Sequence, residues 1–323
     1  MLDDKNILIT GGTGSFGRKF TEIVLKKYKP RRLIIFSRDE LKQFEMAQVF
    51  SKEKYNCIRY FIGDVRDKER LHRAFQGIDY IIHAAALKQV PAAEYNPFEA
   101  VKTNILGAQN VIDVAIDHKI KRVVALSTDK AANPVNLYGA TKLCSDKLFV
   151  AGNSYVGRNQ TRFSVVRYGN VAGSRGSVIP FFKKCLKKGV LPITDPRMTR
   201  FWITLEQSVN FVLECLEHMV GGEIFVPKLP SMNIMDLARA IGQNCKTEIV
   251  GIRPGEKLHE VMVPRDDAPS TVEYETFYLI KPGFQFFERR FCENGCKKVP
   301  ENFEYSSGTN TRWLTVDEMK AMI

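Results

Sequence analysis

Short apolar runs alternate with helix-length segments in the first half of the chain, and this alternation constrains the fold most strongly. The helix-length segments include Phe16–Lys27 and Ala100–His118. Apolar strands separated by helices are typical of a parallel sheet covered on both faces. Right-handed crossovers then predict a doubly wound, Rossmann-type α/β fold. The predicted strands are Asn6–Thr10, Arg32–Phe36, Ile58–Ile62, Tyr80–His83, Val123–Ser127 and Phe163–Tyr168.

The pattern changes after the sixth predicted strand. Residues 169–201 are rich in Gly, Pro, Arg and Ser, as expected of chain that lines a cleft. A helix is then predicted over Leu205–Met219 and a strand over Gly222–Val226, which can return to the sheet. A chain of 323 residues suits one large α/β unit and a smaller partner. We expect a larger domain of residues 1–169 plus about 203–226, and a smaller domain of 170–202 and 227–323.

The chain carries a formal net charge of +12. An anionic partner explains this charge, and so does a generally basic surface. Lys and Arg are spread along the chain in short clusters such as Lys183–Lys184, and no block of five like charges occurs. A nucleic-acid tail is therefore poorly supported, and we expect no nucleic-acid partner.

Neither a secretory signal nor a membrane span is expected from the sequence. The N-terminus runs directly into the first predicted strand, and no apolar run approaches the ~20 residues of a spanning helix. Seven cysteines at scattered spacing indicate free thiols in a reducing compartment. Cys292 and Cys296 form a lone C-x3-C without the four ligands that zinc needs. We expect a cytoplasmic protein with no metal and no membrane partner.

A glycine-rich loop separates the first predicted strand from the first helix. Gly12, Gly14 and Gly17 match G-x-G-x-x-G, and Gly11 with the last two matches G-x-x-G-x-x-G. Absent Cβ atoms let backbone approach a pyrophosphate, and the helix N-terminus adds amides and a positive dipole end. In this strand–loop–helix context the motif predicts a dinucleotide site in the larger domain. The alternative is a plain turn.

The end of the second predicted strand distinguishes NADP from NAD. An acidic residue there binds an NAD ribose, whereas an arginine favours the 2′-phosphate of NADP. Ser37 and Arg38 come first and favour NADP, while Asp39 keeps NAD open. Asp64, after the third strand, predicts an adenine-binding turn, with a simple helix cap as the alternative.

Tyr138 and Lys142 form a Y-x3-K pair that follows the fifth predicted strand. Residues four apart share one helix face, and this part of the chain lies at the carboxyl edge where such sheets bind ligands. A tyrosine of pKa ~10 is a poor base unless nearby positive charge stabilises its phenolate. We assign Tyr138 as the base for a sugar 4-OH, Lys142 as its activator and ribose anchor, and Thr128 as a hydrogen-bonding partner of the same oxygen.

Asp129 and Lys130 provide an ionisable pair directly before that helix. Once a 4-keto group forms on a hexose, the C5 proton becomes acidic and the 6-OH becomes a leaving group. A base at C5 and an acid at O6 would complete a dehydration. A surface ion pair is the alternative for these neighbours.

Together these motifs resemble the extended short-chain dehydrogenases/reductases, in the segments Thr10–Gly17, His83–Lys88, Asn104–Gly107, Thr128–Lys130 and Tyr138–Lys142. More specifically, the chain resembles the inverting UDP-N-acetylglucosamine 4,6-dehydratases that begin pseudaminic acid synthesis. Six stretches carry this resemblance: Phe36–Gln43, Thr128–Lys142, Arg167–Val171, Gly173–Ser177, Thr199–Trp202 and Arg253–Lys257. It covers nearly the whole chain and fades after about Pro282.

The resemblance implies roles for the ionisable pair. Retaining dehydratases carry Thr-Asp-Glu where this chain has Lys130 in place of Glu. In the inverting group this lysine is the C5 base and the aspartate the acid for water loss, which assigns these roles to Lys130 and Asp129. A lysine base must be neutral when it acts; burial and cations lower its pKa, whereas Asp129 raises it. The balance between these effects stays open at this point.

The resemblance also implies an NADP cofactor that stays bound, a UDP-N-acetylglucosamine substrate, inversion at C5 and a homo-oligomer. Arginines suit the UDP pyrophosphate because their planar forks bind phosphate bidentately. The implied cofactor residues are Gly11, Thr13, Gly14, Ser15, Phe16, Gly17, Ser37, Arg38, Glu40, Lys42, Asp64, Val65, Ala84, Ala86, Tyr138 and Lys142. The implied substrate residues are Lys88, Asn170, Ser174, Arg175, Gly176, Ser177, Val178, Thr194, Arg200, Arg253 and Glu256. His83 and His259 are interpreted as structural.

Two rival functions remain. A retaining dehydratase or a nucleotide-sugar 4-epimerase would keep Tyr138 and Lys142 but has no need of Lys130. A non-catalytic NADP-binding regulator would use the same fold without turnover.

Overall fold

Seven parallel strands form the centre of the molecule. The computed structural model describes residues 1–157, 160–174, 176–284, 291 and 295–323. Hydrogen bonds join the parallel strands in the order β3-β2-β1-β4-β5-β6-β10, which confirms the predicted doubly wound sheet. Their bounds are β1 Asn6–Thr10, β2 Arg32–Ser37, β3 Ile58–Ile62, β4 Tyr80–His83, β5 Arg122–Thr128, β6 Arg162–Tyr168 and β10 Ile224–Pro227.

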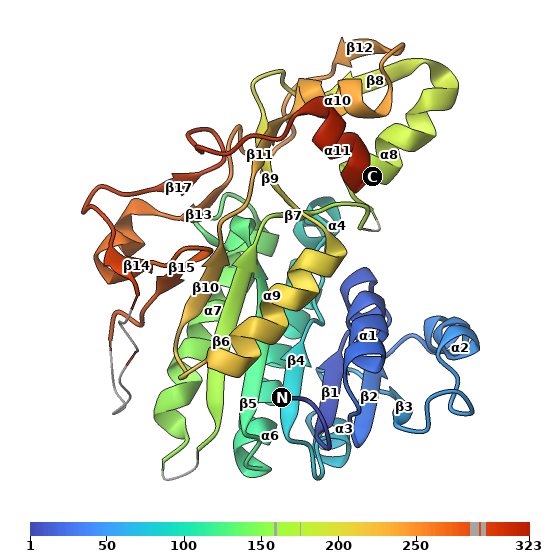
Figure 1. Ribbon diagram of the computed structural model, residues 1–323, viewed down its shortest axis with the longest axis vertical. Helices are drawn as coiled ribbons and strands as arrows, with labels where there is room; N and C mark the ends of the chain where they lie inside the picture. Colours follow the sequence, from blue (N-terminus) through green and yellow to red (C-terminus); the bar gives the residue numbers. More distant parts are fainter. Residues whose placement is uncertain (158–159, 175, 285–290, 292–294) are drawn as a thin grey trace.

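Helices cover both faces of this sheet (Figure 1). Helices α1 (Ser15–Lys27) and α9 (Leu205–His218) pack together on one face. On the other face α6 (Gly107–Asp117) contacts both α3 (Lys68–Ala74) and α7 (Leu137–Tyr155). Except in the edge strand β3, the side chains of the parallel strands are mostly buried on both sides, as the continuous apolar runs predict. The remaining helix on this sheet is α2, Glu40–Val49, which contacts β2 and β3.

The long helix predicted before β5 is present but irregular. Helices α4 (Val90–Tyr95) and α5 (Pro97–Val101) lead into a π-helical turn, η1 (Lys102–Leu106), and then into α6. Asn104 lies in this turn, and its side chain bonds both the N–H and the C=O of Leu87, at 2.8 and 2.9 Å. The irregular turn therefore ties the helix to the segment that follows β4, in keeping with the use of π-turns at functional sites.

Antiparallel strands extend the sheet beyond β10. Strand β15 (Phe277–Ile280) pairs with β10, β14 (Thr271–Glu273) pairs with β15, and β16 (Lys297–Lys298) pairs with β14. Chain after residue 227 thus returns to the main sheet and packs its apolar side chains into the main core.

Several smaller elements, α8, α10 and α11 among them, lie beyond the carboxyl ends of the parallel strands (Figure 1), and they carry a second, smaller core. It is formed by apolar side chains that include Ile179, Phe182, Trp202, Leu237 and Met319. Two separate cores support a two-part organisation, and the domain boundaries stay a prediction. The elements here and beside it are β7 Asn170–Val171, α8 Val178–Cys185, β8 Val190–Ile193, β9 Thr199–Ile203, β11 Ser231–Asn233, α10 Ile234–Ile241, β12 Lys246–Ile249, β13 Val261–Val263, β17 Tyr305–Ser306 and α11 Val316–Met322.

Three further observations concern the described part of the chain. No helix there is both long and apolar enough to span a bilayer. Cys57, Cys144, Cys185, Cys215 and Cys245 are free thiols, whereas Cys292 lies outside the described residues. No group of three or more metal-ligating side chains gathers in it.

Candidate active site

A cavity of about 1070 Å³ lies at the carboxyl ends of the parallel strands. It extends from the β1–α1 loop to the elements of the smaller core. Strand order reverses between β1 and β4, so the cavity occupies the switch point at which doubly wound sheets bind ligands. Its volume exceeds the roughly 300–1,000 Å³ typical of one small-ligand site. The cavity therefore has room for a cofactor and a substrate together.

The glycine loop fits a pyrophosphate. Gly11 has φ +64°, and a Cβ on Gly17 would lie 2.2 Å from the carbonyl oxygen of Gly12, so packing requires both glycines. A Cβ on Gly14 would meet only the Gly11 oxygen, at 3.2 Å, and would otherwise fill open space. Gly14 is also the N-cap of α1, where no side chain caps the helix. The helix end thus presents backbone to the cavity, as an anion site requires.

Side chains at the end of β2 shape one end of the cavity. Ser37 lies 2.9 Å from Thr13 through their hydroxyls, and the side chain of Arg38 is half exposed. Asp39 instead caps α2, accepting a 2.9 Å hydrogen bond from the Lys42 N–H and pairing with its ammonium. Hydrogen bonds from Lys42 lower the pKa of Asp39. The Asp39 carboxylate, which was the reason to consider NAD, therefore serves as the N-cap of α2.

Asp64 is held by arginines. It accepts hydrogen bonds from the Arg66 side chain at 2.8 and 3.0 Å, and Arg38 lies 3.6 Å away. The N-cap of α3 is Asp67, so the interpretation of Asp64 as a helix cap is wrong. Glu40 is exposed and does not line the cavity.

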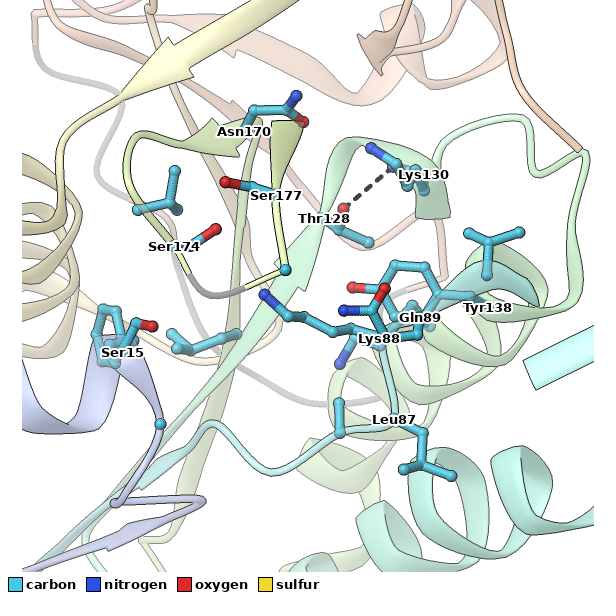
Figure 2. A pocket seen from close by; sticks show the side chains of 18 of the residues that line it. Ser15, Leu87, Lys88, Gln89, Thr128, Lys130, Tyr138, Asn170, Ser174 and Ser177 are labelled. Atoms are coloured by element: carbon cyan, nitrogen blue, oxygen red, sulfur yellow. Dashed lines mark hydrogen bonds between the residues drawn. The ribbon is translucent and has the colours of Figure 1, made fainter. Parts of the chain in front are cut away.

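Strand β5 leads directly to the predicted catalytic residues. Its last residue, Thr128, caps a 3-10 turn over Asp129–Ala131, and α7 then presents Tyr138 and Lys142 to the cavity. A Cβ on Gly139 would lie 2.2 Å from the Lys130 carbonyl oxygen, so only glycine lets α7 begin against this turn. In Figure 2, Thr128, Lys130 and Tyr138 lie together on the cavity wall.

Burial controls the protonation of Tyr138 and Lys142. Burial raises the pKa of Tyr138 to about 12, although the Lys130 ammonium and the Thr128 hydroxyl act in the opposite direction. Burial lowers the pKa of Lys142, against the opposing effect of Asp146 one turn away. Without ligands Tyr138 is therefore a neutral phenol. To act as a base near neutral pH it needs further positive charge nearby, which would lower its pKa.

A buried polar network contacts the middle of α7 through Asp146. Asp146 accepts a 2.8 Å hydrogen bond from the Ser127 hydroxyl and a 3.3 Å bond from Arg167. Arg167 also donates to the Met262 carbonyl oxygen at 3.0 Å. These contacts join β5, β6, α7 and β13, so the catalytic helix is held rigidly. His83, bonded to Thr10 at 2.9 Å, is likewise buried in the core.

Asp129 and Lys130 form a buried pair and not a surface one. The Asp129 side chain is 1% exposed, and its Oδ1 lies 3.0 Å from the Lys130 Nζ. The Glu260 carboxylate approaches the same Nζ to 3.3 Å. Burial favours the neutral amine, but the two carboxylates outweigh it and raise the pKa of Lys130. Burial, reinforced by Glu260, raises the pKa of Asp129. The two carboxylates thus outweigh burial, and Lys130 is an ammonium when no ligand is bound.

Glu260 is the main residue that sequence reasoning missed. It lies three residues beyond the Arg253–Lys257 stretch, and no spacing connects it with Lys130. Two hydrogen bonds dock that stretch on the catalytic turn: Asn136 to the Gly255 oxygen, at 2.8 Å, and Lys257 to the Ala132 oxygen, at 2.7 Å. Other cavity residues that were not predicted include Gln89, Lys184, Trp202 and Ile234.

The predicted residues converge on the cavity almost without exception. In Figure 2, Asn170, Ser174 and Ser177 lie around the part into which Lys88 extends. Arg175 lies outside the described residues. Asp129 is buried and does not line the cavity, but it contacts Lys130, which does. The other predicted cofactor and substrate residues, Glu40 excepted, all line the cavity.

This geometry agrees with the comparisons with known proteins. Residues 7–282 match the family described as polysaccharide biosynthesis protein. The chain belongs to this family. It is 58% identical, over all of its length and 98% of the relative's, to a Campylobacter jejuni protein named UDP-N-acetylglucosamine 4,6-dehydratase (inverting). It is 43% identical, over all of its length and 96% of the relative's, to a Rickettsia canadensis protein named UDP-glucose 4-epimerase.

Among solved structures, Pen from Bacillus thuringiensis superposes on this family member with a TM-score of 0.91. The two are 38% identical, and the match covers all of this chain and 98% of Pen. A doubly wound α/β fold with an additional smaller part is thus shared over the whole length.

Proposed function

We propose that this protein is a UDP-N-acetylglucosamine 4,6-dehydratase that inverts C5 and uses bound NADP. The observation that carries the proposal is the Asp129–Lys130 pair beside Tyr138, in a cavity that has room for two ligands. Dehydration needs an acid and a base in addition to the oxidising tyrosine, and this pair provides both. The relative that is 58% identical bears the same name, which supports the substrate.

NADP is the cofactor that the residues favour. Arg38 presents a half-exposed guanidinium at the end of β2, whereas Asp39 is occupied as a helix cap. Gly14 and the start of α1 would hold the pyrophosphate, and Lys142 the nicotinamide ribose. A bound nicotinamide supplies the oxidation at C4 and the reduction at C6, so no external reductant is consumed.

Tyr138 would remove the proton of the sugar 4-OH as C4 is oxidised. Its pKa of about 12 without ligands must fall for this step, and Lys130 already acts in that direction. Positive charge from the bound cofactor would lower it further. Thr128, at the end of β5, hydrogen-bonds the Tyr138 hydroxyl, so it would bind the same sugar oxygen and orient the sugar.

The Asp129–Lys130 pair would then perform the elimination. A proton shift across their 3.0 Å contact converts carboxylate and ammonium into carboxyl and amine, the acid and base that the step needs. The amine takes the C5 proton, and the carboxyl protonates O6 as the C6–O bond breaks and water leaves. The C5–H electrons form the C5=C6 bond, and the pair returns to the ion pair seen here. Reprotonation of C5 from the opposite face gives inversion.

Basic side chains would hold the nucleotide of the substrate. Arg253, Arg200, Lys88 and Lys184 line the cavity and would neutralise the diphosphate. Cytoplasmic location and self-association stay predictions.

An NMR time course in D2O tests the proposed function. With UDP-N-acetylglucosamine and no added reductant, we expect a 4-keto-6-deoxy product that carries deuterium at C5. An unchanged 6-CH2OH group would exclude dehydration. A product that keeps this group but is epimerised at C4 would favour an epimerase, the activity in the name of one relative. Retained C5 configuration would exclude only inversion.

Replacing Arg38 with alanine tests the cofactor assignment. We expect affinity for NADP to fall about 10- to 150-fold, the equivalent of a lost charged hydrogen bond of roughly 1.5–3 kcal/mol. Affinity for NAD should change little, which makes NAD the internal control. Calorimetric titration of cofactor-depleted protein measures both. Equal weakening for the two cofactors would contradict a 2′-phosphate contact.

A further inference from the structure

Glu260 is a buried carboxylate that the mechanism above does not use. Its side chain is 3% exposed, and it lies directly before β13, which belongs to chain far from the catalytic helix in sequence. The backbone N–H of Glu260 donates to the Ser307 hydroxyl at 2.9 Å. Since Ser307 also bonds Thr199, the residue is anchored between two segments and holds a defined position.

Three cations surround this carboxylate. Its Oε1 lies 3.3 Å from the Lys130 Nζ and 3.6 Å from the Arg200 Nε, and its Oε2 lies 4.0 Å from the Lys257 Nζ. Burial opposes ionisation of Glu260, but these cations outweigh it and lower its pKa. Asp129 faces Lys130, Thr128, Tyr138, Glu260 and Lys257, and no arginine among the described residues forms an ion pair with it. Of the two carboxyls, Asp129 is therefore the one that gains a proton.

Each carboxylate also has one oxygen without a hydrogen-bond partner among the described residues. These atoms are the Asp129 Oδ2 and the Glu260 Oε2, and both are buried. Buried acceptors are normally satisfied, so such exceptions call for an explanation. Two carboxylates that share one site drive their pKa values apart, and that separation assigns acid and base roles.

The elimination constrains the number of protons on the Asp129–Lys130 pair. The pair must carry one mobile proton throughout: on the carboxyl before the step, and on the amine after it. With two protons the base is blocked, and with none the acid is missing. A negative charge next to both groups makes both proton losses occur at higher pH. The charge of Glu260 therefore moves the whole one-proton range upward in pH.

We propose that Glu260 is the positioning residue of the elimination site, whose fixed negative charge sets the pH range in which the Asp129–Lys130 pair carries its single working proton. The catalytic part rests on the proposed function, whereas the charge coupling does not. Lys88 also faces Lys130 and contributes positive charge to the same site. Arg200 and Lys257 keep Glu260 ionised, so its charge persists while Asp129 and Lys130 exchange a proton.

The test compares Glu260→Gln with wild type by two measurements. Competitive acetylation with acetic anhydride, followed by peptide mass spectrometry, reports the neutral fraction of Lys130 in the holoenzyme. In Glu260→Gln we expect the Lys130 midpoint to fall by roughly 1–3 pH units, so labelling near pH 10 rises about tenfold or more. Both limbs of the kcat/KM profile on UDP-N-acetylglucosamine should move to lower pH.

Two further variants serve as controls. Glu260→Asp keeps the charge and should keep Lys130 labelling close to wild type. Glu273→Gln removes a carboxylate from a 2.7 Å ion pair with Lys228 outside the cavity, and it should leave Lys130 unchanged.

Unchanged Lys130 labelling in Glu260→Gln would overturn the proposal. A uniform drop in rate with both pH limbs in place would show a merely structural role and overturn it too. If wild type fails to dehydrate UDP-N-acetylglucosamine while the labelling shift occurs, the proposed function fails and the charge coupling stands.

Discussion

Replacing Tyr138 with phenylalanine lowers kcat by about 10²–10⁴-fold, the usual contribution of a positioned general base. The ring still fills its place on the cavity wall, so only the ionisable oxygen is lost. We expect the cofactor to stay bound, because the glycine loop and Lys142 are untouched. Turnover is measured by NMR with UDP-N-acetylglucosamine, and bound cofactor by absorbance after denaturation.

Tyr155→Phe provides the matched control. Tyr155 lies at the end of the same helix with 61% of its surface exposed, so this change should leave kcat unaltered. Full activity in Tyr138→Phe would overturn the catalytic assignment. An inactive wild type that binds DNA with strong salt dependence would favour the non-catalytic regulator.

Replacing Lys130 with arginine abolishes elimination while preserving the charge, and we expect product formation to fall by about 10²–10⁴-fold. Arginine keeps a cation between Asp129 and Glu260, so the buried carboxylates stay compensated and the protein folds. A guanidinium cannot become the neutral base that takes the C5 proton. The measurement is loss of the 6-OH and deuterium uptake at C5 by NMR in D2O.

Lys121→Arg makes the same change in an exposed 2.8 Å pair with Asp79, remote from the cavity, and should leave turnover intact. A wild-type elimination rate in Lys130→Arg would refute the role of Lys130 as the C5 base. Loss of binding to UDP-N-acetylglucosamine, with an unchanged rate at saturation, would instead make Lys130 a substrate contact.

The sequence predicts the parallel part of the sheet closely. Strands β1, β3 and β4 have the predicted bounds, and β5 extends the prediction by one residue at each end. Fully buried strands leave a continuous apolar signal that needs no knowledge of their neighbours. The antiparallel strands β14 and β15 escaped prediction because no helix separates them, so the strand–helix alternation that identified the parallel strands is missing there. The π-turn escaped it because Asn104 bonds Leu87 through tertiary contact.

Local motifs and the family resemblance together predicted about half of the residues that line the cavity. Glycines, the Tyr138–Lys142 pair and the Asp129–Lys130 pair act over short spacings, which the chain itself preserves. Glu40 was predicted beside Arg38, but the turn of α2 leaves it exposed and away from the cavity. Adjacency in sequence does not determine which side chains share a surface once a helix begins.

The sequence alone predicted a doubly wound α/β chain with a glycine loop suited to a phosphate and a tyrosine–lysine pair at the sheet edge. Only the tertiary structure decided that Asp129 is buried, and that Glu260, itself paired with Arg200 and Lys257, lies against Lys130. The physical reason is that helix and strand periodicity depends on neighbouring residues in the sequence. Burial of Asp129 and its charge coupling to Glu260 depend on segments more than a hundred residues apart, which meet only on folding.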